Sequence, residues 1–161
     1  MRKVLFVLVG MLLLVGCSQK QKSVPQDDSN LEKVVADSST VGPAYDSLVV
    51  CESRAMVDSA YRNSDEFKKV HETYTSLYER MTEGMDKVNA DLLQLKLAIS
   101  AFNHSSEYFA THSSEMSNVV NQKRMMLYGQ KIREIRQRLI QSKLSDTQQA
   151  HLDSLNTLIH F

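Results

Sequence analysis

The longest regular pattern of apolar residues in this chain runs from residue 63 to residue 103. One apolar column recurs every seven residues, and a second falls between its members at offsets of three or four, which is the periodicity of one face of an α-helix. The first column contains Phe67, Tyr74, Met81, Val88, Leu95 and Phe102, and the second contains Val70, Leu77, Met85, Leu92 and Ile99. The pattern predicts one long helix, capped by Asn63 with Glu66 as capping-box partner. Unbroken, this helix would be about 60 Å long.

The second column drifts around this helix, which is typical of a nearly straight bundle helix and not of a two-stranded coiled coil. Shorter amphipathic patterns predict further helices at residues 44–62 and 114–143. A capping box from Ser145 to Gln148 predicts a break and a last helix after it. The segment between residues 103 and 115 is rich in residues that cap or turn, so we expect the chain to reverse there.

These patterns predict an all-α domain at residues 44–161, an elongated three- or four-helix bundle built on an antiparallel helical hairpin. No proline occurs in this range, and nothing in it is typical of strands. Residues 65–91 contain seven acidic and four basic residues, whereas residues 122–143 contain seven basic residues and a single acidic one. An antiparallel return would set the basic half of the 114–143 helix beside the acidic half of the long helix. Arg124, Lys131 and Arg138 recur every seven residues beside the apolar stripe, where charges favour a partner and an orientation.

The first residues of the chain form a different kind of segment. Arg2 and Lys3 precede an apolar run of about a dozen residues, which is shorter than the roughly 20 residues that span a bilayer core. A basic start followed by such a run is typical of a secretory signal. The run ends in Leu14-Val15-Gly16-Cys17, and this motif resembles the lipobox of bacterial lipoproteins. The alternative is a short anchor helix that ends in a buried cysteine.

The resemblance implies a covalent anchor. Residues 1–16 would be the lipoprotein signal peptide, and Cys17 would carry a diacylglyceryl thioether and an N-acyl chain. Two or more acyl chains are enough for stable attachment to a bilayer. Ser18, where an Asp would retain such a protein in the inner membrane, favours the outer membrane, and the absence of acidic residues directly after Cys17 favours its periplasmic side. Residues 17–43 are polar and would form the lipidated, disordered tether, with at most a short helical turn at residues 31–36.

Composition narrows the function classes. The chain has 19 basic and 19 acidic residues, and loss of Arg2 and Lys3 with the signal leaves a net charge of −2. This balance gives no argument for binding nucleic acid. We find no Ser-His-Asp elbow, P-loop, Cys-x-x-Cys motif or glycine-rich phosphate loop, so we expect no enzyme and no cofactor beyond the lipid on Cys17.

A repeated His-Ser-Ser-Glu motif is the first candidate for chemistry. Imidazole and carboxylate groups are metal ligands, and residues three apart share one face of a helix. The four residues concerned are His104, Glu107, His112 and Glu115. They form either a metal site or a hairpin tip with serine caps.

Four basic residues and one cysteine are two further candidates for a functional site. Lys123, Arg124, Lys131 and Arg138 either bind an anionic surface such as lipid headgroups or pair internally with acidic residues. Cys51, the thiol left once Cys17 is lipidated, is either buried, paired between chains, or a reactive nucleophile.

Together these observations predict a membrane-anchored envelope lipoprotein that acts as a helical interaction or scaffolding module. Its partners would be the lipid bilayer, through Cys17, and an envelope protein. One alternative is a metal- or small-ligand-binding periplasmic lipoprotein. The other is a self-assembling, coiled-coil-like structural lipoprotein.

Overall fold

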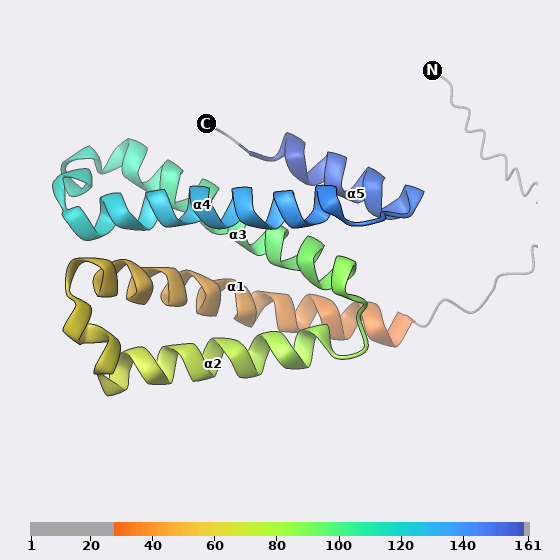
Figure 1. Cartoon of the computed structure of the whole chain (residues 1–161), viewed down its shortest axis with the longest axis horizontal. Helices are drawn as coiled ribbons and strands as arrows, with labels where there is room; N and C mark the ends of the chain where they lie inside the picture. The colour runs from red at the N-terminus through yellow and green to blue at the C-terminus, as the bar shows by residue number, and fades with distance from the viewer. Residues whose placement is uncertain (1–27, 160–161) are drawn as a thin grey trace, which may run out of the picture.

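The computed structural model describes residues 28–159, with side chains from residue 40 onward. These residues form five α-helices and two short 3-10 helices, and none of them forms a strand, so the all-α prediction is confirmed. In chain order the elements are α1 (Asp28–Val57), η1 (Ser59–Asn63), α2 (Asp65–Thr82), α3 (Lys87–Thr111), η2 (Ser113–Ser117), α4 (Val119–Gln141) and α5 (Asp146–Thr157) (Figure 1).

Helix α1 occupies the middle of the bundle. Successive long helices run in opposite directions, and α1 packs against α2, α3 and α4 (Figure 1). Helix α4 packs against both α1 and α3, and α5 folds back along α3. Among the described helices, α2 has an extended packing contact with α1 only, although Tyr78 reaches α3 and donates a hydrogen bond to the carbonyl oxygen of Ala90 at 2.9 Å.

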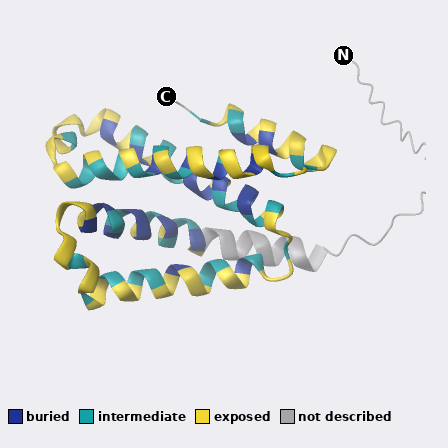
Figure 2. Ribbon diagram, viewed as in Figure 1, coloured by how far each residue is buried: buried dark blue, intermediate teal, exposed yellow. Residues whose placement is uncertain are grey.

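The core lies where the inward faces of α1, α3 and α4 meet. Buried positions, dark blue in Figure 2, follow one stripe on α1 and α4 but spread over more of α3. Helix α3 is therefore the most enclosed of the long helices, because α4 and α5 cover different sides of it. The least exposed large side chains are Tyr45, Tyr128, Leu92, Leu95, Ile99 and Leu139.

The predicted long helix is two helices. The chain turns at Glu83–Asp86, between α2 and α3, and Gly84 there has a φ of +77°. Glycine adopts this left-handed conformation without steric cost, and the side chain of Asp86 then caps α3 by accepting a hydrogen bond from the Asn89 amide at 2.9 Å. The apolar columns continue through this turn because both helices face the same core. The periodicity of apolar residues therefore could not show that the helix is interrupted.

Two predicted helix starts are also displaced. Asn63 belongs to η1, and the cap of α2 is Ser64, whose hydroxyl accepts from the Phe67 amide at 3.2 Å. The 103–115 segment does not reverse the chain at its start, because α3 continues through Thr111. The reversal comes at η2, and Asn118 caps α4. The capping box of Ser145 and Gln148 at the start of α5 is confirmed.

Helix α1 begins at Asp28, well inside the segment that was predicted to be a disordered tether. Pro43 lies within this helix, and its carbonyl oxygen accepts a hydrogen bond from the Ser47 hydroxyl at 2.9 Å. Val41 is fully buried in the core, which gives this part of the helix a packing partner that the sequence did not reveal. The predicted signal peptide and residues 17–27 lie outside the described residues.

Candidate functional site

Three basic residues of α4, spaced seven apart, pair with acidic residues of other helices. Arg124 lies 2.7 Å from Asp46 on α1, Lys131 lies 2.8 Å from Glu52 on α1, and Arg138 lies 2.7 Å from Asp91 on α3. Residues seven apart return to one side of a helix after two turns, so this ladder follows one edge of α4. Internal charge pairing therefore accounts for three of the four predicted binding residues, and Lys123 is the fourth.

The acidic partners differ from those expected. Helix α4 packs on α1 and α3, so its basic edge does not lie along α2. Of the three partners, only Asp91 belongs to the acidic stretch 65–91, and the other two lie on α1. The predicted side-by-side placement of the acidic and basic halves is thus wrong for α2. The chain reverses once more than the sequence indicated, and this changes which helices are neighbours.

The pair at the N-terminal half of α4 is part of a small network. Arg124 donates to both carboxylate oxygens of Asp46, at 2.7 and 2.9 Å, and the Tyr128 hydroxyl donates to the same carboxylate. Burial raises the pKa of Tyr128, and its hydrogen bond to Asp46 raises it further, so the phenol remains a donor. This network joins α1 to α4 and leaves no free charge at Asp46 for a ligand.

The side of α4 that faces away from the bundle is different in character. Val119, Met126 and Ile140 are 51%, 43% and 71% exposed, and they are spaced by multiples of seven residues, with Arg133 at the remaining position of the series. We call these four residues, together with Lys123, the α4 outer face. Neither Lys123 nor Arg133 has an ion-pair partner among the described residues.

A shallow hollow of about 260 Å³ lies on this side of α4, lined in part by Arg133, Arg136 and Ile140. The Nε atom of Arg136 is buried without a hydrogen-bond partner in the described part of the chain. Arg133 lies back over Gly129, since its Nη1 is 3.5 Å from where a Cβ of that residue would be. Two guanidinium groups and an exposed isoleucine thus share one small surface.

The structure does not bring the residues of the repeated His-Ser-Ser-Glu motif together. His112 ends α3 and stacks on Tyr108 at 4.2 Å between ring centroids, and the Tyr108 hydroxyl donates to Glu115 at 2.8 Å. His104 and Glu107 lie about two turns back along α3, beside a hollow of about 400 Å³ near Leu158. Among residues 28–159, no three His, Cys, Asp or Glu side chains are placed to hold a metal ion.

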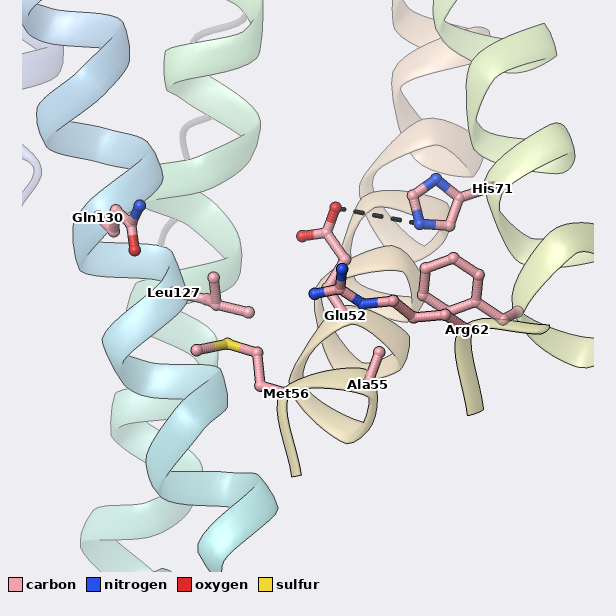
Figure 3. Close-up of a pocket in the computed structure, with 8 residues that line it drawn as sticks. Glu52, Ala55, Met56, Arg62, His71, Leu127 and Gln130 are labelled. Carbon is pink, nitrogen blue, oxygen red and sulfur yellow. Dashed lines mark ion pairs between the residues drawn. The ribbon is translucent and has the colours of Figure 1, made fainter. Parts of the chain in front are cut away.

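A third hollow, of about 500 Å³, opens between α2 and α4 above α1 (Figure 3). Its apolar lining comes from all three helices: Ala55 and Met56 on α1, Phe67 on α2 and Leu127 on α4. In Figure 3 the Met56 side chain extends from α1 toward Leu127. The volume falls within the range of about 300–1,000 Å³ that small-molecule sites have.

Polar groups complete this hollow. The Glu52 carboxylate uses one oxygen for Lys131, and its other oxygen lies 4.0 Å from Nε2 of His71. The His71 ring lies against Phe67, at 4.3 Å between centroids, and its Nε2 is buried without a hydrogen-bond partner. Arg62, from η1, also lines the hollow and has no ion-pair partner among the described residues. No sequence pattern indicates this set, because its members come from four elements and share no spacing.

The two cysteines have separate outcomes. Cys17 lies outside the described residues, so its lipidation stays a prediction. Cys51 is buried on α1, with 5% of its surface exposed, and its sulfur lies 3.4 Å from the Tyr61 hydroxyl. Of the three interpretations that the sequence left open for Cys51, the structure confirms the buried thiol.

Comparison with known proteins gives no relative. No protein-family model, curated protein or solved structure matches the chain. Within the described residues, no helix combines the length and apolar character that crossing a membrane requires.

Proposed function

We propose that this protein is a lipid-anchored lipoprotein of the bacterial envelope whose helical domain binds a partner protein through the α4 outer face. The Leu14-Val15-Gly16-Cys17 motif supports the anchor, and the location we propose is the periplasmic side of the outer membrane. The proposal assigns the domain no catalysis and no cofactor beyond the lipid on Cys17. Its role is to hold a helical surface close to the membrane.

The α4 outer face is the observation that carries the proposed interaction. Val119, Met126 and Ile140 leave apolar surface exposed along one line of a helix that buries a separate stripe of Tyr128, Ile132, Ile135 and Leu139. Apolar residues at heptad spacing are the pattern by which one helix packs against another. The surface therefore suits a partner helix with its own apolar stripe.

The charged residues around the apolar stripe of α4 indicate which charges the partner should carry. Lys123 and Arg133 lie on the outer face and Arg136 beside it, whereas Glu134 is the only acidic residue of α4 and accepts a hydrogen bond from Gln130 at 2.8 Å. An acidic helix would complement these groups. A second copy of α4 would oppose like charges, so we favour a different protein over self-assembly through this face.

Site-specific photocrosslinking in intact envelopes tests this proposal. A photoreactive phenylalanine analogue would replace Met126 or Ile140 in the full-length chain, with the exposed Thr75 of α2 as the matched control position. We expect a discrete crosslinked product of one mass from both α4 positions and none from position 75. Equal products from all three positions, or none from α4, would overturn the interaction.

The anchor is tested in the same cells. Mass spectrometry of the Cys17 peptide should show the added acyl chains, and Cys17→Ala should release the chain from the membrane fraction and remove the crosslink. An unmodified Cys17 would contradict the lipoprotein assignment, whatever the crosslinking result.

A further inference from the structure

The hollow above α1 is separate from the α4 outer face, since the two share no residue. It exists because α2 packs along α1 without extending to α4, so the seam between α2 and α4 stays open on this side. Its floor is Ala55, which is buried, and its rim includes Met56, which is 39% exposed. A methionine left at a rim offers an adaptable apolar contact to a ligand.

The charges of the hollow do not cancel. Glu52 is its one acidic lining residue, and this carboxylate is already paired with Lys131 at 2.8 Å. Arg62 is therefore left as the uncompensated charge of the lining, with no acidic partner in the described part of the chain. A hollow with apolar walls and one uncompensated guanidinium attracts an anion.

His71 adds a directed polar group. Its Nε2 is buried without a hydrogen-bond partner, and the Glu52 oxygen 4.0 Å away is too distant to accept a hydrogen bond from it. A carboxylate on that side favours the tautomer with the proton on Nε2. The imidazole thus carries an N–H without an acceptor at the edge of the hollow.

We propose that this hollow binds a small amphipathic anion, a molecule with an apolar body and a single carboxylate. The apolar body lies between Met56, Phe67 and Leu127, and the carboxylate binds Arg62. A turn of the His71 ring away from Glu52 brings its Nε2–H to the same carboxylate. The ligand site is independent of the lipid anchor and of the protein partner proposed above.

Photolabelling with 4-benzoylbenzoate tests this site, because the probe combines two aromatic rings with one carboxylate. The full-length chain would be held in nanodiscs of zwitterionic lipid and irradiated with a subsaturating amount of probe, and labelled residues would be mapped by mass spectrometry. The matched neutral probe is 4-benzoylbenzamide, which has the same rings without the charge. We expect the acid to label residues 55–56 and 127, and the amide to label them about tenfold less.

Variants separate the site from general surface labelling. Arg62→Gln should lower labelling by the acid about tenfold and leave labelling by the amide unchanged. Arg80→Gln, at an exposed arginine of α2 that does not line the hollow, should change neither. Met56→Glu, which places a like charge at the rim, should also abolish labelling of Leu127 by the acid.

Three results would overturn the proposal: equal labelling by the acid and the amide, labelling by the acid that Arg62→Gln leaves unchanged, or labels that fall outside the hollow. Circular dichroism of each variant confirms that its fold is retained. Labelling is read from the chain whether or not Cys17 holds it in the nanodisc, and it requires no partner protein, so its failure is distinguishable from failure of the proposed function.

Discussion

Arg138 of α4 donates a hydrogen bond of 2.7 Å to the carboxylate of Asp91 on α3, across 47 residues of sequence. Asp91 is 8% exposed, so this carboxylate is one of the few charged groups enclosed by the bundle. The same arginine also donates to Gln94 at 3.0 Å. The pair thus fixes the C-terminal half of α4 against the N-terminal half of α3.

Removing the arginine should cost stability because it leaves a buried carboxylate without its partner. We expect Arg138→Met to lower the free energy of unfolding by about 1–2 kcal/mol, since Arg138 itself is partly exposed and screened. Urea denaturation followed by circular dichroism measures this change. Arg133→Met, at a neighbouring arginine without an acidic partner, should change stability by less than about 0.5 kcal/mol.

A double-mutant cycle with Asp91→Asn isolates the pair. The double variant should be more stable than the sum of the two single effects predicts, by about 1 kcal/mol. Strict additivity would show that the two groups do not interact in solution.

Ionisation of Tyr45 should lower the free energy of unfolding at alkaline pH. Burial raises the pKa of Tyr45 well above its ordinary value of about 10, and its hydroxyl has no hydrogen-bond partner among the described residues. Above pH 10 the unfolded chain loses this proton while the folded chain keeps it, so the free energy of unfolding should fall by about 1.4 kcal/mol per pH unit for this group. The stabilisation is complete below pH 10 and is lost as the pH rises from there.

Tyr45→Phe removes this titration without removing a hydrogen bond. We expect the variant to be at least as stable as the parent at pH 7, because it no longer buries an unpaired hydroxyl, and to lose stability less steeply above pH 10, as measured by urea denaturation at each pH. Identical slopes for the two proteins would contradict the assignment.

Two glycines should respond to alanine in opposite directions. Gly84 has a φ of +77°, so Gly84→Ala should destabilise the turn between α2 and α3 by about 1 kcal/mol. Gly129 lies inside α4, where an added Cβ would meet only the flexible end of Arg133 at 3.5 Å. Gly129→Ala should therefore stabilise the protein by about 0.5–1 kcal/mol. Thermal unfolding of both variants beside the parent checks the signs, and equal effects would contradict the turn.

Cys51 should be slow to react, because its sulfur is buried against Tyr61. In a Cys17→Ser background, native protein should react with a disulfide reagent at least about tenfold more slowly than unfolded protein. Met56→Cys combined with Cys51→Ser provides an exposed thiol as the fast control. A disulfide-linked dimer after mild oxidation would contradict this arrangement.

The sequence predicted the helical content well because the signals are local. The apolar columns between residues 63 and 103 follow helical periodicity, and Ser145 and Gln148 carry a capping box that forms as expected. The break at Gly84 was not predicted, because an apolar stripe shows only that helices face a core and not that they are continuous. The start of α1 was not predicted, because Pro43 and the polar residues before it are typical of a tether. Burial of Val41 stabilises the helix there.

The candidate sites could likewise be predicted from the sequence only in part. The seven-residue spacing of Arg124, Lys131 and Arg138 placed them on one edge of a helix, but the choice between internal pairing and an anionic surface depended on which helices are neighbours. The hollow around Arg62 and His71 could not be predicted, because residues from separate elements meet there without any shared spacing.

By itself, then, the sequence determined that this protein is helical, where most of its helices lie, and that residues 14–17 carry a lipoprotein-like motif. Only the tertiary structure decided that α2 and α3 are separate helices, that α4 pairs with α1 and α3, and that a hollow opens between α2 and α4. The physical reason is that helix formation depends on hydrogen bonds and side chains within a few residues. The choice of neighbours depends instead on burying every helix face at once, which is a property of the whole chain.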